Sequence, residues 1–140
     1  MSRVPTHIID VMATFVELSG AKYPKEHRGH DIRPMEGTSF APLLRGASTI
    51  DRRQPPYWEL EGNRAMRDGD WKLVGQEGQP WELYNLARDR TELRNLASAE
   101  SNRVAQMSSA YETWAQRCGV GSWQELSKHL SNLPPAAAKK

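Results

Sequence analysis

The side chains that could carry chemistry are few, and the first of them are one cysteine and two neighbouring histidines. Cys118 directly precedes Gly119 at the expected end of a helix, where the negative end of the helix dipole disfavours a thiolate. His27 and His30 stand three residues apart, with Asp31 next to them, but their polar segment defines no metal geometry. We interpret Cys118 as structural and the histidines as exposed loop residues, and we predict no metal site.

A second group of candidates consists of carboxylates. Glu59 and Glu61 alternate with Leu60, which on one strand would turn both carboxylates to the same side. Such a pair could serve as an acid and a base, although a solvated strand face is the default interpretation. His7 is interpreted as a hydrogen-bonding group. Because the sequence also has no glycine-rich phosphate loop, zinc-protease motif or nucleophile elbow, we predict no catalytic residue in this chain.

Composition excludes some partners. The chain has 140 residues, a net charge of +2 and 26% charged residues, a balance too mild to indicate nucleic acid or an anionic membrane. No apolar run approaches the roughly 20 residues of a spanning helix, and the first residues lack the apolar core of a secretory signal. We therefore expect no nucleic acid and no membrane as partners, and the compartment stays open between cytoplasm and periplasm. The five tryptophans are expected in the core, with a stacking platform for bases or sugars as the alternative.

These residues must be positioned by helices and strands, and the first expected helix covers residues 6–19. Pro5 and Thr6 indicate its start and Gly20 its end. Its apolar residues occupy most of the cylinder: Ile8, Ile9, Val11, Met12, Ala13, Phe15, Val16 and Leu18. Such a helix is normally buried on several sides, and the remaining chain is too small and too polar to cover it. We therefore predict a missing neighbour, which is either a larger parent protein or a second copy.

The middle of the chain predicts loops followed by a small antiparallel sheet. Residues 21–56 read as loops with one helical turn after Ser39, and strands are expected at 57–61, 63–67, 71–74 and 81–86. Asp68-Gly69 favours a two-residue hairpin turn that would place Met66 opposite Trp71 and Arg64 opposite Leu73. In this arrangement those four side chains share one face of the sheet.

Two helices are expected after the sheet. Val104, Met107, Tyr111 and Trp114 form one stripe over residues 101–117, which is typical of a helix packed on one face of a sheet. Ser98 or Ser101 is expected to cap its start and Gly119 to end it. The spacing of Ser122 and Glu125 predicts a capped last helix near 123–131, and residues 134–140 a frayed tail. Together, the expected helices and the small antiparallel sheet predict an α+β fold.

Four segments in order resemble one known family, the type I sulfatases, which include the arylsulfatases of the alkaline-phosphatase superfamily. VPTHIIDVMATFVELSGAKYP is similar to the helix after the catalytic half, and MEGTSFAPLLRG is similar to the family's Gly-x-Ser-hydrophobic segment. YWELEGNRAMRDGDWKLV resembles its Trp-Glu-His-Glu-Gly-Asn-Arg-Ala strand pair, and PWELYNLARDRTELRNLA resembles its Glu-Leu-Tyr-Asp-Leu signature. The resemblance runs from about Val4 to Val120 and implies the carboxy-terminal part of such an enzyme.

The resemblance implies which part of a sulfatase each segment of this chain would form. Residues 1–56 would be the end of the catalytic domain, 57–133 the carboxy-terminal subdomain and 134–140 a flexible tail. The hairpin would then line the substrate cleft, and the cleft candidates are Glu59, Leu60, Glu61, Asn63 and Arg64. Leu60 stands where the family has His, which puts a polar contact to substrate at that position in doubt.

The family's chemistry depends on groups that this sequence does not match. Formylglycine and calcium are expected in a full-length relative, whereas this chain is expected to hold no cofactor and to be inactive alone. Its expected partner is the amino-terminal sulfatase domain. The alternative is a stand-alone binding or regulatory module that self-associates through its first helix.

Overall fold

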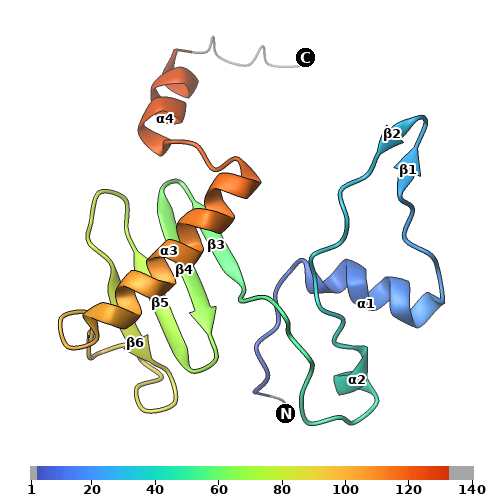
Figure 1. The fold of residues 1–140 in the computed structure, drawn as a ribbon, viewed down its shortest axis with the longest axis horizontal. Helices are drawn as coiled ribbons and strands as arrows, with labels where there is room; N and C mark the ends of the chain where they lie inside the picture. The colour runs from blue at the N-terminus through green and yellow to red at the C-terminus, as the bar shows by residue number, and fades with distance from the viewer. Residues whose placement is uncertain (1–2, 133–140) are drawn as a thin grey trace, which may run out of the picture. The chain divides into compact units, whose positions relative to one another are not determined.

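The computed structural model describes residues 3–132 and divides the chain into two compact units, Met1–Gln54 and Pro55–Lys140. The first unit holds α1 (Asp10–Ser19), β1 (Glu26–His27), β2 (His30–Asp31) and α2 (Ala41–Leu44). The second holds β3 (Tyr57–Leu60), β4 (Asn63–Asp68), β5 (Trp71–Gly75), β6 (Glu82–Asn85), α3 (Ser101–Cys118) and α4 (Trp123–Ser131) (Figure 1). This mixture of helices and antiparallel sheet confirms the α+β prediction. The predicted tail at 134–140 lies outside the described residues.

The first unit is organised around the carboxylate of Asp10, which is completely buried. It accepts hydrogen bonds from the backbone N–H of His7 (2.6 Å) and of Thr38 (2.8 Å), and it forms an ion pair with Arg52. The segment that carries Thr38 can lie this close because Gly37 has no side chain, since a Cβ there would come within 2.1 Å of the Ile9 carbonyl oxygen. Asp10 therefore ties α1 to two segments that follow it at distances of 28 and 42 residues.

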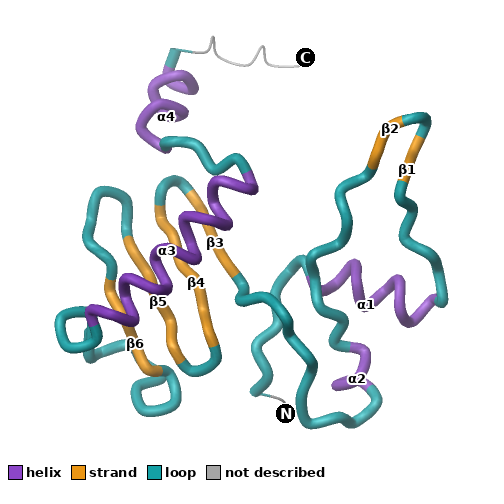
Figure 2. Tube along the Cα trace, in the orientation of Figure 1, coloured by secondary structure: helices purple, strands orange, loops and turns teal. Residues whose placement is uncertain are grey.

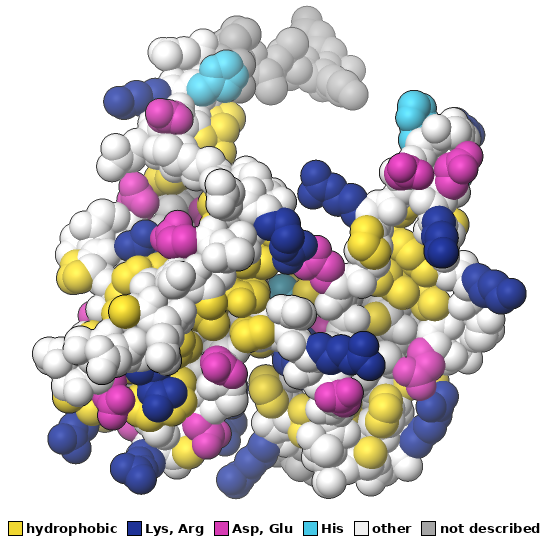
Figure 3. Space-filling model, in the orientation of Figure 1, with side chains coloured by type: hydrophobic (Ala, Val, Ile, Leu, Met, Phe, Trp, Pro, Cys, Tyr) yellow, Lys and Arg dark blue, Asp and Glu magenta, His cyan; other side chains and the backbone are white. Residues whose placement is uncertain are grey.

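The apolar surface of α1 remains largely uncovered. The helix buries Asp10, Ala13 and Thr14, whereas Ile8 is 78% and Phe15 62% exposed. Met12 and Leu18 are exposed as well, and Figure 3 shows hydrophobic side chains on the surface over α1. The helix ends at Gly20, as expected, but it begins at Asp10 rather than at Thr6. The expectation of an incompletely covered helix therefore holds for the described residues.

The loops predicted for residues 21–56 contain a hairpin that the sequence analysis missed. β1 and β2 pair with His27 opposite His30, and the turn between them uses Arg28 and Gly29, both with positive φ. Phe40 rather than Ser39 occupies the cap position of α2, although the Ser39 hydroxyl accepts a hydrogen bond from the Ala41 N–H (3.1 Å) at the start of this helix.

The second unit is a four-stranded antiparallel sheet in the order β3-β4-β5-β6, with α3 crossing one face (Figure 2). The pairing aligns Tyr57, Met66, Leu73 and Leu83 in one row across the four strands. Met66, Leu73 and Leu83 are almost fully buried, and they pack with Met107, Tyr111 and Ala115 of α3. The expected stripe on this helix is confirmed, and Trp71 and Trp81 pack against the same core.

The register of the β4–β5 hairpin differs from the prediction. The two turn residues are Gly69 and Asp70, so Met66 lies opposite Leu73 and Arg64 opposite Gly75. Gly69 alone has positive φ in this turn, which fits a turn with glycine in its first central position. The partner positions move by two residues, and because side chains alternate with a period of two, the predicted set still shares one face.

Helix boundaries in the second unit follow the sequence closely, with one exception. Gly119 ends α3 with a φ of 72°, and the Ser122 side chain accepts a hydrogen bond from the Glu125 N–H at the start of α4. The predicted serine cap of α3 is wrong, because Glu100 occupies the cap position and makes no side-chain cap bond. Across residues 3–132, none of the helices combines the length and the apolar character that crossing a bilayer requires.

Candidate functional site

A groove in the second unit lies where the β3–β4 turn meets the connection from α3 to α4. Two adjoining hollows of about 610 and 410 Å³ form it, and they share Glu59, Val120, Gly121 and Trp123. We call this the hairpin groove; its further lining residues are Leu60, Glu61, Gly62, Arg64, Glu77, Tyr111, Glu112, Ala115, Cys118, Gly119, Ser122, Gln124 and Leu126. It contains four of the five cleft candidates, all except Asn63.

The near wall of the groove is formed by the cross-strand row of the sheet that lies next to the buried core row. Glu59 pairs with Arg64, and Arg64 pairs with Gly75, so these residues face α3 like the buried row beside them. The Arg64 guanidinium lies over the Trp81 ring at 4.2 Å. A Cβ on Gly75 would come within 3.0 Å of Arg64 and 3.1 Å of Trp81, so glycine leaves room for this stacking.

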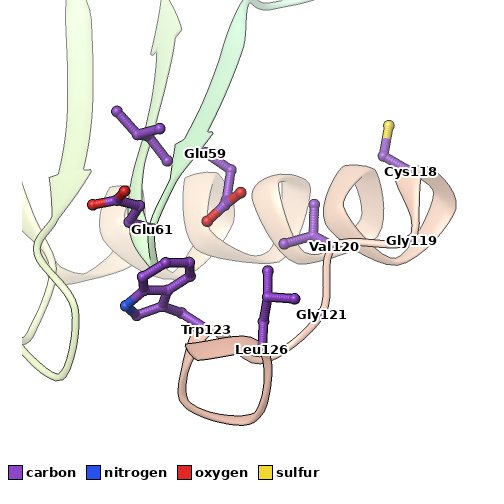
Figure 4. Close-up of a pocket in the computed structure, with 9 residues that line it drawn as sticks. Glu59, Glu61, Cys118, Gly119, Val120, Gly121, Trp123 and Leu126 are labelled. Carbon is purple, nitrogen blue, oxygen red and sulfur yellow. The ribbon is translucent and has the colours of Figure 1, made fainter. Parts of the chain in front are cut away.

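The two carboxylates do not lie on one strand as expected. β3 ends at Leu60, and Glu61 belongs to a two-residue turn with Gly62 in which both residues have positive φ. The Glu59 carboxylate accepts a hydrogen bond from the Gly62 N–H (2.8 Å) and so supports this turn. Figure 4 shows both carboxylates at the groove, with Trp123, Val120 and Leu126 facing them from the far side.

The remaining two candidates, Leu60 and Asn63, lie where β3 ends and β4 begins. Leu60 pairs with Asn63, and Leu60 is 70% exposed at the rim. The Asn63 side chain donates to the Leu60 carbonyl (3.0 Å) and accepts from the Glu77 N–H (3.3 Å). Asn63 therefore fixes the shape of the turn and the position of the β5–β6 loop beside it.

Sequence reasoning missed the far wall of the groove, which is formed by residues 118–126. The spacing of Ser122 and Glu125 predicted the helix that begins in this wall, but not its approach to the β3–β4 turn. Cys118 is exposed at the end of α3, and its sulfur points away from Trp123 and the carboxylates (Figure 4). Within residues 3–132, no three His, Cys, Asp or Glu side chains group closely enough to hold a metal ion.

The charge of the groove is predominantly negative. Four carboxylates line it, from Glu59, Glu61, Glu77 and Glu112, whereas Arg64 is the one cationic lining residue among residues 3–132. Burial and the nearby negative charge of Glu59 together raise the pKa of Tyr111 to about 12. The groove can therefore accept hydrogen bonds from hydroxyl groups, but it holds no cluster of cations for a sulfate.

Residues 80–97, the segment that resembles the family signature, form β6 and much of the loop that follows it. Asn85 accepts hydrogen bonds from the N–H groups of Ala87 and Arg88, and Asp89 accepts one from the Arg94 N–H (2.7 Å). The Asn95 side chain accepts from the N–H of Leu83 (3.2 Å) and of Ala97 (2.9 Å). These side chains replace backbone partners in a loop that has no regular structure.

Alkaline conditions are expected to destabilise the second unit. A hydrogen bond to Glu82 raises the pKa of Tyr84 to about 12, and Tyr111 reaches about the same value. Unfolded tyrosine ionises near pH 10, so the unfolded state loses protons first and stability falls as pH rises from about 10 to 12. Phenolate absorbance and circular dichroism should follow this loss. Replacing Tyr84 by Phe should make the fall in stability with rising pH shallower. An unchanged dependence of stability on pH in that variant would contradict the assignment of this effect to Tyr84.

Proteins of similar sequence include two sulfatases that are much longer than this chain. No family model matches the chain. It is 29% identical over 119 residues to an uncharacterized sulfatase of Schizosaccharomyces pombe, and 30% identical over 109 residues to the choline-sulfatase of Rhizobium meliloti. These matches cover 81% and 73% of this chain but only 22% and 20% of the relatives. The chain thus spans about a fifth of the length of these two relatives.

The fold has a solved counterpart. The crystal structure of Ps i-CgsB aligns with a TM-score of 0.63 at 24% identity, covering 79% of this chain and 24% of that protein. At this identity, the likeness concerns the fold.

Proposed function

Because this chain is related to the sulfatases and resembles their carboxy-terminal region, we propose that it is the carboxy-terminal portion of a sulfuric-ester hydrolase whose substrate cleft is bordered by the β3–β4 hairpin. The catalytic groups then belong to polypeptide that is not among residues 1–140. In this proposal the chain positions substrate and completes the fold, and it does not turn over substrate alone.

The observation that carries the proposal is the uncovered apolar surface of α1. Met12 and Phe15 of α1 are both more than half exposed, as is Ile8 just before the helix, and the buried Asp10 holds this segment in place. A contiguous apolar surface on an ordered helix marks an interaction site. The relatives are about five times as long as the stretch matched here, so they contain the polypeptide that could cover such a face.

The hairpin groove supports a role in holding the organic part of a substrate. Its carboxylates can accept hydrogen bonds from hydroxyl groups, and Trp123 offers an apolar ring face. Because Arg64 is the one cation that lines the groove within the described part of the chain, the sulfate of the ester would lie outside the groove, near cations of the amino-terminal domain. Formylglycine as the nucleophile and calcium as the charge-stabilising ion would also come from that part.

The alternative function is a stand-alone oligomeric module derived from a sulfatase. The same exposed face of α1 favours it, because a second copy could cover the face across a two-fold axis. The two functions differ in what covers α1, and this difference can be measured.

An antibody against the second unit, used on extracts of the source cells, tests the proposal. We expect a polypeptide several times heavier than 15.9 kDa, or a 15.9 kDa chain that co-purifies with a larger sulfatase-like subunit. A 15.9 kDa homo-oligomer would support the alternative instead, and a 15.9 kDa monomer would contradict both.

An activity assay provides the second arm of the test. The purified chain, given an aryl sulfate and calcium, is expected to show no hydrolysis above the uncatalysed rate. Hydrolysis that disappears when Glu59 is replaced by Gln would show that this chain carries catalytic groups, and would overturn the proposal.

A further inference from the structure

We propose that the loop between β6 and α3 is a binding surface for a sulfated polysaccharide, separate from the hairpin groove. Its residues Arg88, Arg90, Leu93 and Arg94 are all exposed, and we call them the arginine loop. The choice of a sulfated partner rests on the proposed function, but the binding itself needs no catalysis.

The composition of residues 88–94 is nearly balanced, with three arginines and two acidic residues. The acidic side chains, however, are engaged by partners within the loop and on β5. Asp89 accepts hydrogen bonds from the Arg94 N–H (2.7 Å) and the Thr91 hydroxyl (3.3 Å), and these contacts lower the pKa of its carboxyl. Both Glu92 oxygens contact Lys72 Nζ at 2.7 and 2.8 Å. The outward surface is therefore more basic than the composition indicates.

The loop is also held in shape before any ligand arrives. Asn85 fixes its start and Asn95 its end through the backbone hydrogen bonds described above, and Glu92 adopts a φ of 59° in the turn. A preformed surface loses less conformational entropy when it binds. No ion pair involves the side chains of Arg88, Arg90 or Arg94 among residues 3–132.

The hydrogen-bonding geometry of the guanidinium indicates which kind of partner the arginine loop would bind. A guanidinium donates two parallel hydrogen bonds to an oxyanion, which suits the oxygens of sulfate groups repeated along a polymer. Figure 3 shows Lys and Arg side chains along the lower edge of the second unit, where this loop runs in Figure 1. Such a surface would hold the polymer while one of its esters reaches a cleft elsewhere.

Binding of dextran sulfate, compared with uncharged dextran, tests the proposal. The wild-type chain should bind dextran sulfate in a salt-dependent manner and should not bind dextran. The R88Q/R90Q/R94Q variant should bind at least about tenfold more weakly, and the slope of log affinity against log salt should fall by roughly 2. The control R28Q/R33Q/R53Q variant removes three exposed arginines elsewhere and has the same net charge.

The outcomes separate the proposal from its rivals. Equal weakening in both triple variants would mean that overall charge, not the arginine loop, causes binding, and would overturn the proposal. Stronger binding to anionic lipid vesicles that is lost on replacing Leu93 by Ala would also overturn it, in favour of a membrane surface. Because binding is measured without hydrolysis, a homo-oligomer in the antibody experiment would disprove the proposed function and leave this result standing.

Discussion

Replacing Asp10 by Ala is expected to unfold the first unit while the second unit stays folded. The Asp10 side chain is completely buried, and that of its partner Arg52 is only 14% exposed. The substitution leaves the guanidinium without its counter-charge and also removes the acceptor of two backbone N–H groups. Breaking a buried pair from one side costs about 3–5 kcal/mol, which is a large part of the stability of a unit this small.

Hydrogen exchange of the backbone amides measures this effect unit by unit. Amides of α1 should lose protection in the Asp10→Ala variant, while those of β4 and β5 keep it. Asp51→Ala is the matched control, because the Asp51 side chain is 90% exposed and lies 3.8 Å from Arg53, a pair worth less than about 1 kcal/mol. Unchanged protection of α1 in the Asp10 variant would show that the ion pair does not hold the unit together.

The same carboxylate predicts a response to acid. Burial alone would raise the pKa of Asp10, but the hydrogen bond from Arg52 and those from His7 and Thr38 outweigh it and hold the pKa below its usual value. The unfolded state therefore binds the proton more readily, so the stabilisation is present above about pH 4 and is lost as pH falls through the folded-state pKa. The Asp10→Ala variant should lack this acid dependence in α1.

How much of the fold the sequence could predict depends on how local its determinants are. The ends of α1 and α3 at Gly20 and Gly119 were predictable because a left-handed residue at a helix end needs glycine. The β4–β5 turn was displaced because Asp68-Gly69 and Gly69-Asp70 are both acceptable turns. What decides between them is the packing of Met66, Leu73 and Leu83 against α3, a helix that lies well beyond the hairpin in sequence.

The candidate site shows the same limit more sharply. Its near wall was predictable, because Glu59 and Arg64 lie on the recognisable hairpin. Its far wall depends on how Trp123 and Leu126 turn back after α3, and no local pattern specifies that approach. Asp10 was likewise missed, since a single acidic residue at the start of an apolar helix normally lies in solvent and its partner Arg52 is 42 residues away.

Replacing Tyr111 by Ala is expected to destabilise the second unit by about 3–5 kcal/mol. The Tyr111 side chain is 3% exposed, and its ring lies 5.3 Å from that of Trp81, 5.4 Å from that of Trp114 and 6.4 Å from that of Tyr57. Its removal leaves a cavity where the core meets the hairpin groove. Urea unfolding followed by tryptophan fluorescence measures the loss, and the near-ultraviolet circular dichroism of these rings should collapse with it.

The Tyr111→Phe substitution distinguishes the contribution of the ring to stability from that of the hydroxyl. It keeps every ring contact, so we expect a change of less than about 1 kcal/mol. If Phe costs as much as Ala, the hydroxyl rather than aromatic packing holds this region together, and the groove owes its shape to a polar contact. If Ala costs little, the core row and α3 are stable without Tyr111. We expect a large loss of unfolding free energy with Ala and a small one with Phe. This pair of results would mean that aromatic packing sets the distance between the sheet and α3. That distance in turn sets the width of the groove that we assign to substrate.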